Sequence, residues 1–518
     1  MKLADPASPC TFADASLPPV SQLLASGGDA RIAIGPGGAN RYGCRPAPDS
    51  RLLAFGSSTA STISEAGFIA ASALRKKLQA DHALAPATVY ARELERIRSE
   101  LGGLCGFGTG LEPDMIFAAS GTDLHLIAAS LALRDRTQPL DVIIAGVEET
   151  GRGVPMAVTG HHFSSSSALG QQVVEGTSCL DAPIQLHTVP VRNADGTPRN
   201  AAEIDCEIEN LARQAITLYH RVLLVVVDVS KTGLVAPSPS CAIALRNAFP
   251  ESIDLMVDAC QFRISSATLQ NYLGNGFMVA LTASKFLTGP TFAGVLMVPD
   301  GVASGIRRQL PSEGISNYSS RADWPVDWYG ADRLNSTANY GQLLRWEAGL
   351  AELRRFAAVP EARVTAILES FSNAVIARLQ GDPRFEPLAV PALDRGHVAS
   401  SGWDCKQTIF PFLLYAAEKC GRRPLSCEEV ALVYQRIGQA RDKAFANGNE
   451  RPGCEIGQPV AVGMRDGTEV SVLRICMSAR LVADAGLAGN EEAVINNAMR
   501  VLDEVAALIS CQLGHASS

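Results

Sequence analysis

The sequence predicts an α/β protein with a large domain built on a mostly parallel sheet, followed by a smaller α+β domain. Three observations lead to this prediction. RVLLVVVDVS and IDLMVDAC are runs of strand length that are too apolar for a strand with one solvated face. Strands of this kind alternate with helical patterns, as in layered α/β domains. After about residue 345 this alternation gives way to long amphipathic helices.

The elements of the large domain follow in chain order. Residues 1–50 are rich in Pro, Gly, Ala and Ser, and we expect an N-terminal arm there. The large domain is expected to span residues 51–345 and to open with two helices, ISEAGFIAASALRKKL and ATVYARELERIRSEL. The strand PDMIFAAS, the turn GTD and the helix LHLIAASLAL come next, then the strand DVIIAG, the loop EETGRG and a helix. GFMVALTAS and AGVLMVP are further predicted strands.

The small domain is expected to span residues 346–518. Its predicted helices are LLRWEAGLAELRRF, which crosses the boundary, RVTAILESFSNAVIARL, SCEEVALVYQRIGQARDKAF and NEEAVINNAMRVLDEVAALI. TIFPFLLY and SVLRICMSARLV are predicted strand regions. The stretches 385–405 and 447–470, rich in Gly, Pro and charged residues, are predicted loops.

Composition limits the class of partner. Of the 518 residues, 47% are hydrophobic and 19% are charged, as in ordinary soluble proteins. The net charge of -8, without any basic block, argues against nucleic acid or an anionic membrane as the main partner. No apolar run is long enough to span a bilayer, and MKLADPASPC does not resemble a signal peptide, so we expect a cytoplasmic protein. The 13 cysteines include no CxxC pair, so no metal site is expected.

Two neighbouring motifs, VDACQ (257–261) and TASKFLTGP (282–290), indicate cofactor chemistry. A lysine at a strand end, such as Lys285, can form a Schiff base with pyridoxal 5′-phosphate (PLP). A carboxylate at the end of a buried strand, such as Asp258, can pair with the protonated pyridine nitrogen of that cofactor. Taken singly, Lys285 is also compatible with a solvated surface charge and Asp258 with a helix cap.

The segment SGTD lies between a predicted strand and a predicted helix. Ser120, Gly121 and Thr122 therefore offer hydroxyl and backbone N–H groups to a phosphate at a helix N-terminus. The alternative is an ordinary helix N-cap without a ligand.

VDACQ and TASKFLTGPTFAGVL together resemble the class V aminotransferase and cysteine desulfurase family of fold-type I PLP-dependent enzymes. In that family a strand ends in Asp-x-x-Gln, and a Ser/Thr-x-x-Lys follows, with a Gly-Pro turn after it; Gly289 begins that turn here. The resemblance implies that Asp258 pairs with the pyridine nitrogen and that Gln261 contacts the 3′-oxygen of the ring. It implies that Thr282 binds phosphate, and that Lys285 forms the internal aldimine and moves the substrate α-proton. It also implies a seven-stranded sheet and a homodimer with its sites at the interface.

Other segments fall in the order of the family, so that the resemblance covers roughly residues 50–510. FGSSTAS resembles the entrance to the site, which makes Ser58 a candidate for substrate binding. RLNSTANYG resembles the segment that reaches the phosphate of the neighbouring subunit, with Ser336 and Thr337 as candidates. VLRICMSA resembles the strand whose arginine binds the substrate carboxylate. Arg474 is the candidate, Arg480 competes with it, and a guanidinium suits the task because it binds a carboxylate at two points.

The sequence departs from the family pattern around the cofactor ring. Ser284 stands immediately before the lysine, where the family has a histidine. The loop GVEETGRG places Thr150 or Glu149 where the family stacks a ring on the cofactor. An acidic residue there can act as acid or base or bind a cationic substrate group, or EETG can cap the following helix. Candidates for the missing ring are His125, His161 and His162.

A further departure concerns the nucleophilic cysteine of desulfurases. The corresponding loop reads RPGCEIGQPV, in which the best alignment puts Ile456 at the nucleophile position and leaves Cys454 two residues away. Lys231 stands in a turn where the family often has a polar amide near the ring. Its side chain can approach the 3′-oxygen or the substrate carboxylate, or it can point to solvent.

These observations predict a PLP-dependent enzyme that acts at the α-carbon of an amino acid through the Lys285 aldimine, as a lyase or a transferase in specialised metabolism. The alternatives are a cysteine desulfurase that uses Cys454 as persulfide carrier, and a PLP-fold protein without catalytic activity.

Overall fold

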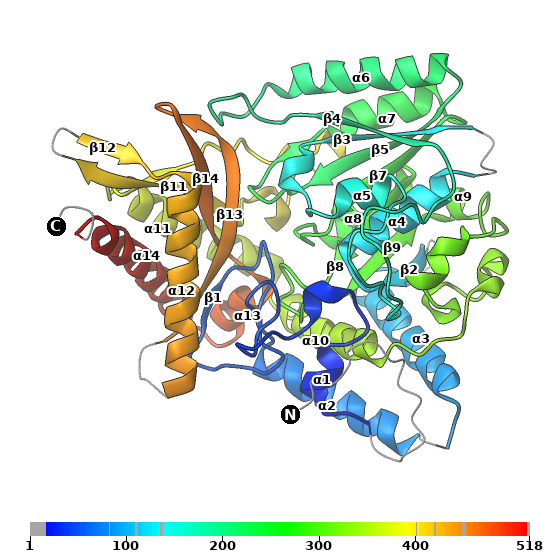
Figure 1. Ribbon diagram of the computed structural model, residues 1–518, viewed down its shortest axis with the longest axis horizontal. Coiled ribbons are helices and arrows are strands. Elements are labelled where there is room, and N and C mark those ends of the chain that lie inside the picture. The colour runs from blue at the N-terminus through cyan, green and yellow to red at the C-terminus, as the bar shows by residue number, and fades with distance from the viewer. Residues whose placement is uncertain are drawn as a thin grey trace.

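The computed structural model describes residues 17–81, 83–108, 112–134, 138–399, 401–418, 421–447 and 452–514. Within them the chain forms two β-sheets, each flanked by helices (Figure 1). The larger sheet occupies the upper right of the view, and the smaller one lies on the left beside the C-terminus.

The larger sheet contains all six strands predicted for the large domain, together with strands that were not predicted. It comprises β2 (Asp114–Ala118), β3 (Leu140–Ala145), β4 (Ile184–Val189), β5 (Arg221–Asp228), β7 (Ile253–Ala259), β8 (Phe277–Thr282) and β9 (Gly294–Val298). The strand order is β2-β9-β8-β7-β5-β3-β4, and the short β6 (Val235–Ala236) pairs with β5. In the main path only β9 is antiparallel to its neighbours. The predicted seven-stranded, mostly parallel sheet is confirmed.

The apolar runs are continuous because both faces of this sheet are covered. On β5, Val222, Leu224 and Val226 belong to one core cluster, and Leu223, Val225 and Val227 belong to another. Helices α6 (Ala201–Thr217), α7 (Pro239–Ala248) and α8 (Ser266–Gly274) contribute to the first cluster. Helices α4 (Gly121–Ala132), α5 (Val154–Val158) and α9 (Asp300–Ala303) contribute to the second. Successive side chains of a strand point to opposite faces, so burial on both sides requires an unbroken apolar run.

The smaller sheet has the order β1-β13-β14-β11-β10, with β12 paired to β11. Its strands are β1 (Leu53–Phe55), β10 (Phe385–Pro387), β11 (Ile409–Glu418), β12 (Gly421–Pro424), β13 (Cys454–Arg465) and β14 (Thr468–Cys476). The helices around it are α11 (Glu361–Gln380), α12 (Cys427–Asn447), α13 (Ala479–Leu487) and α14 (Glu491–Gly514). The prediction of a loop over 447–470 was wrong for β13, which pairs along its length with β14. In the other predicted loop, over 385–405, the first three residues form β10.

A long helical layer joins the two parts of the chain. Helices α2 (Glu65–Ala80), α3 (Pro86–Leu104) and α10 (Tyr340–Ala357) pack on one another below the larger sheet (Figure 1). The N-terminal arm, with α1 (Val20–Leu24) and a 3₁₀ turn η1 (Ala30–Ile32), packs on α10. The buried guanidinium of Arg345 fixes the arm by donating hydrogen bonds to the carbonyl oxygens of Ser26 and, at 2.7 Å, Gly27. This contact holds the following turn at the edge of the larger sheet.

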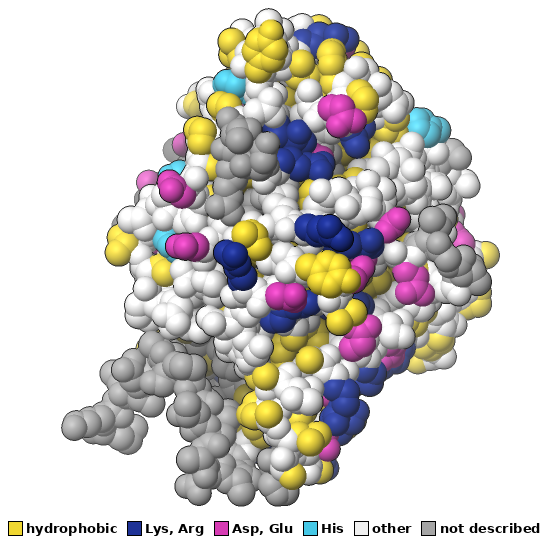
Figure 2. Space-filling view, turned by 90° about the vertical axis from the view of Figure 1, so that its right-hand side faces the viewer, with side chains coloured by type: hydrophobic (Ala, Val, Ile, Leu, Met, Phe, Trp, Pro, Cys, Tyr) yellow, Lys and Arg dark blue, Asp and Glu magenta, His cyan; other side chains and the backbone are white. Residues whose placement is uncertain are grey.

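The surface is mixed in charge on the face seen in Figure 2, where basic and acidic side chains are interspersed. Among the described helices, none has the length and apolar character needed to cross a membrane.

Candidate active site

A cavity of about 630 Å³ opens at the edge of the larger sheet where its parallel strands end. Strands β2, β3, β5, β7 and β8 all end at this edge, and β9 begins there, because β9 alone runs in the opposite direction. Ligands of open α/β sheets bind at the carboxyl ends of the strands. The segments that follow these strands, together with part of the smaller sheet, line the cavity.

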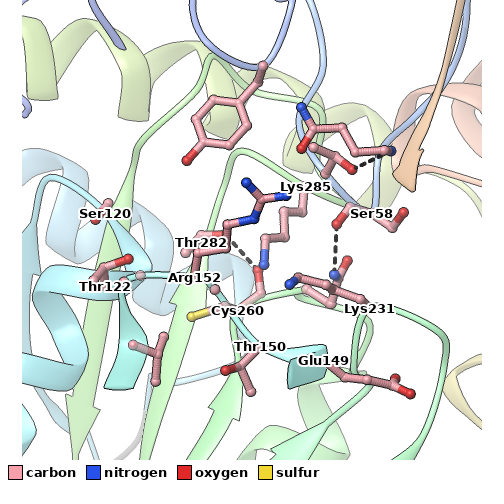
Figure 3. Close-up of a pocket in the computed structure, with 18 of the residues that line it drawn as sticks. Ser58, Ser120, Thr122, Glu149, Thr150, Arg152, Lys231, Cys260, Thr282 and Lys285 are labelled. Atoms are coloured by element: carbon pink, nitrogen blue, oxygen red, sulfur yellow. Dashed lines mark hydrogen bonds between the residues drawn. The ribbon is translucent and has the colours of Figure 1, made fainter. Parts of the chain in front are cut away.

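Lys285 and Asp258 both line this cavity. Asp258 lies near the end of β7, and Lys285 lies in the turn that follows β8, the neighbouring parallel strand. Within the described residues, the Lys285 amine makes no hydrogen bond and no ion-pair contact, and Figure 3 shows its side chain extended into the cavity. A primary amine that is held in a cavity without a partner is available to react with a carbonyl group.

His125 supports Asp258 from behind. Its Nδ1 donates to the carbonyl oxygen of Gly121 at 2.7 Å, one helical turn earlier, and its Nε2 lies 3.3 Å from Asp258 Oδ2. Since Nδ1 carries a proton, an attractive contact at Nε2 requires the doubly protonated ring. Burial lowers the pKa of His125, but Asp258 outweighs it, so the net pKa is raised. Burial likewise raises the pKa of Asp258, but His125 and Lys285 hold it well below its usual range.

The segment at the start of α4 lines the cavity with its hydroxyl groups. Ser120 is the N-cap of α4 and accepts a hydrogen bond from the backbone N–H of Asp123 at 3.4 Å. SGTD therefore caps this helix, and its role as a phosphate site stays a prediction. Thr122 and Thr282 also face the cavity, and Thr282 Oγ1 donates to Cys260 O at 2.6 Å. A Cβ on Gly121 would lie 2.8 Å from Cys260 Sγ, so only glycine lets the helix start this close to β7.

Arg31 reaches the same segment from the N-terminal arm. Its guanidinium donates to Thr122 Oγ1 at 3.1 Å and to Ser120 Oγ at 3.3 Å, and it forms an ion pair with Asp29 at 2.6 Å. It also lies over the ring of Phe292, 4.7 Å from the centroid. Guanidinium, hydroxyl and helix N-terminus together form a donor set suited to a phosphate. The sequence carries no signal for Arg31, because the arm has no periodic pattern that would place it.

Gln261 and Ser58 connect the two sheets at the base of the cavity. Gln261 Nε2 donates to Ser58 O at 3.0 Å, and both side chains are buried among the lining residues. Arg263, completely buried, donates to Ser57 Oγ at 2.9 Å and to Thr408 Oγ1 at 2.7 Å. These bonds fix the segment after β1 against the end of β7. Ser284, immediately before the lysine, also faces the cavity.

Arg474 projects from β14 toward the cavity and has no carboxylate partner within the described residues. It donates to Thr59 Oγ1 at 2.9 Å and to the carbonyl oxygen of Lys231 at 3.1 Å, while its buried Nε has no acceptor. A Cβ on Gly457 of β13 would lie 2.9 Å from Arg474 Cβ, so a glycine is needed beside it. Arg480 is not among the lining residues and donates instead to two backbone carbonyls.

The loop after β3 does not act as a helix cap. Residues Val147–Glu149 form a 3₁₀ turn, and α5 begins only at Val154 without a side-chain cap. The Glu149 carboxylate pairs with Arg192 at 2.6 Å and accepts hydrogen bonds from Ser230 and Thr232. Its charge is thereby neutralised, which leaves it poorly suited to bind a cationic substrate group. Thr150 lines the cavity and donates to Val147 O at 2.7 Å.

Some sequence candidates lie outside the cavity. His162 Nδ1 contacts the hydroxyl of Tyr318 at 2.6 Å, and neither His161 nor His162 is a lining residue. Ser336 and Thr337 lie in the exposed segment before α10, away from the cavity of their own chain.

The desulfurase hypothesis finds no support in the position of its cysteine. Cys454 is the first residue of β13, buried beside Leu53 of β1, and it is not a lining residue. Burial raises the pKa of its thiol to about 11, so little thiolate is present at neutral pH. Ile456, at the expected nucleophile position, is also buried within this strand. The interpretation of this segment as a loop was therefore wrong, and its cysteine lies outside the cavity.

Solved structures with a similar fold include PLP-dependent enzymes. A lysine-to-alanine variant of C-DES, with glycine covalently linked to its PLP cofactor, is 15% identical over 88% of this chain and 96% of that chain, with a TM-score of 0.53. The complex of the cystine C-S lyase C-DES with its product cysteine persulfide is 14% identical over 88% and 97%, with a TM-score of 0.51. No family model and no curated protein matches the sequence. The chain therefore has the fold-type I architecture, and these identities establish the fold alone.

Proposed function

We propose that this protein is a PLP-dependent enzyme that acts at the α-carbon of an amino acid, as a lyase or a transferase. The observation that carries the proposal is the Lys285 amine, which has no partner in a cavity that also contains the ionised carboxylate of Asp258. The fold, the motif order and the buried Arg474 support the same conclusion.

The residues present fit this cofactor. Thr122, the N-terminus of α4 and Arg31 offer neutral and cationic donors to its phosphate. The hydroxyls of Ser120 and Thr282 donate here to Asp123 and to Cys260 O, and they would have to rotate to donate to the phosphate. Asp258 offers a carboxylate to its pyridine nitrogen. Bound PLP supplies an electron-withdrawing ring that stabilises negative charge at the substrate α-carbon.

Each remaining function falls to a side chain of this protein. Lys285 would hold the cofactor through its amine, and its Nζ would be the group that accepts the substrate α-proton. Asp258, whose pKa His125 helps to hold well below its usual range, would present an ionised carboxylate to the protonated pyridine nitrogen. Arg474 orients the substrate through its carboxylate, and its hydrogen bonds to fixed acceptors restrict the movement of the guanidinium.

The proposed site is completed by a second subunit. Ser336 and Thr337 are accessible on the surface of a single chain, so they are free to meet the phosphate of a neighbouring subunit in a homodimer. The two alternative functions are weaker. Burial of Cys454 disfavours a persulfide carrier, and the coexistence of Lys285 and Asp258 in one cavity disfavours a protein without catalytic activity.

The direct test is an absorbance spectrum of the purified protein beside its Lys285→Ala variant, before and after addition of a panel of amino acids. We expect a visible band that depends on Lys285 and shifts with at least one amino acid. A protein that stays colourless after PLP is added would refute the proposal. A band that no amino acid perturbs would favour the non-catalytic alternative.

A further inference from the structure

The cavity has more positive charge than the proposed cofactor and an α-carboxylate require. Three of its lining cations, Lys231, Lys285 and Arg474, lie inside, and Arg41 and Arg152 are exposed at its rim. None of these five side chains has a carboxylate partner within the described residues. Arg31, by contrast, is paired with Asp29 at 2.6 Å.

The lining carboxylates do not balance this charge. Asp258 is paired with His125 at 3.3 Å, and Glu149 is paired with Arg192 at 2.6 Å. Glu175 is the remaining lining carboxylate, and it is exposed. Positive charge inside a partly enclosed cavity is costly unless an anion enters it, so the excess favours an anionic ligand.

The proposed function leaves Lys231, Arg152 and Arg41 without a partner, and of these Lys231 and Arg152 act on each other electrostatically. The phosphate is assigned to Arg31, the α-carboxylate to Arg474, and Lys285 attaches the cofactor. Lys231 Nζ makes only a contact of 3.3 Å to Glu148 O, and Arg152 makes no hydrogen bond within the described residues. Figure 3 shows both side chains directed toward the end of the Lys285 side chain, where the substrate would bind.

The electrostatic surroundings of Lys231 agree with this geometry. Burial, together with the charges of Arg474, Lys285 and Arg152, lowers the pKa of its amine to about 8, although Glu149 acts in the opposite direction. These cations surround the Lys231 ammonium from β14 and from the segments that follow β3 and β8. An anion bound between them would relieve their mutual repulsion.

We propose, on the basis of the function proposed above, that the substrate is an amino acid with an anionic group on its side chain, and that Lys231 and Arg152 bind this group. The Arg474 guanidinium, whose Nη1 donates to Lys231 O at 3.1 Å, then holds the α-carboxylate immediately beside it. The site thus selects an acidic substrate with two anchoring points.

The test uses inert ligands, so that it does not depend on turnover. Succinate and glutarate are titrated calorimetrically into the purified protein, beside their monoamides succinamate and glutaramate, which have the same shape and one charge less. Because a charge-assisted hydrogen bond contributes about tenfold or more in affinity, we expect at least one dicarboxylate to bind about 10-fold more tightly than its monoamide. Lys231→Met and Arg152→Met should each reduce that preference to less than about 3-fold.

Lys406→Met is the matched control, because Lys406 is a half-exposed lysine paired with Glu369 at 2.7 Å and is not a lining residue. It should keep the full preference for the dicarboxylate.

Equal affinity for acid and monoamide in the unmodified protein, or a preference that survives both Lys231→Met and Arg152→Met, would overturn the inference. A protein that attaches PLP to Lys285 without the preference overturns this inference alone. If the protein prefers the dicarboxylate but does not attach PLP to Lys285, the proposed function is overturned, whereas the binding of an anionic group by Lys231 and Arg152 is still supported.

Discussion

Replacing Arg31 with glutamine tests whether the N-terminal arm takes part in phosphate binding. In the structure the Arg31 guanidinium lies 3.3 Å from Ser120 Oγ and 3.1 Å from Thr122 Oγ1, the hydroxyls expected to meet the phosphate. A hydrogen bond to a charged group contributes about 1.5–3 kcal/mol. The loss of one such bond should therefore raise the dissociation constant for PLP about 10- to 100-fold.

The assay compares PLP with pyridoxal, which lacks the phosphate, by titrating the apoprotein and following absorbance. Arg31→Gln should weaken PLP binding and leave pyridoxal binding nearly unchanged. The ratio of the two dissociation constants should therefore move closer to one. Because Arg31→Gln also leaves the buried Asp29 carboxylate unpaired, the double variant with Asp29→Asn separates a structural loss from the loss of the phosphate contact. If Arg31→Gln weakens the binding of both ligands equally, or leaves the ratio of their dissociation constants unchanged, the reasoning is refuted.

Two further predictions concern stability and pH. Asp228 and Arg395 are fully buried and joined by two hydrogen bonds of 2.7 Å, so Asp228→Ala should lower the free energy of unfolding in urea by about 3–5 kcal/mol. Glu209 and Arg213 form an exposed pair, so Glu209→Ala should lower the free energy of unfolding by less than about 1 kcal/mol. An equal loss of stability in Asp228→Ala and Glu209→Ala would contradict this account. Since the pKa of Lys231 is lowered to about 8 and only its protonated form attracts an anion, dicarboxylate affinity should be full below that pH and fall above it. Calorimetry across this range should show no such fall for Lys231→Met.

The sequence predicted that Asp258 and Lys285 lie close together because its signals there are local. Asp258 lies near the end of one apolar strand and Lys285 follows the next, and the carboxyl ends of neighbouring parallel strands meet at one edge of a sheet. The position of His125 within α4 also follows from the helical pattern. Its contact with Asp258 does not, because that contact joins two strand–helix units that are far apart in the chain.

The features that the sequence did not predict depend on tertiary contacts. Arg31 reaches Ser120 across 89 residues, from an arm whose composition indicates only irregular structure. The strand β4, Ile184–Val189, lies at the edge of the larger sheet, and its partly exposed side chains lack the continuous apolar run of the central strands. β13 contains Gly457 and Pro459, which are unfavourable in most strands, and the glycine is retained because Arg474 packs against it. In each case packing against a distant segment outweighs the local propensity.

The most direct test of the central claim is to reduce the PLP-treated protein with borohydride, digest it and determine by mass spectrometry which lysine carries the cofactor. The account predicts a pyridoxyl group on Lys285, in the peptide that contains TASKFLTGP, and no such modification in Lys285→Ala. Modification of a different lysine, or of none, would contradict the assignment of this cavity as a PLP site.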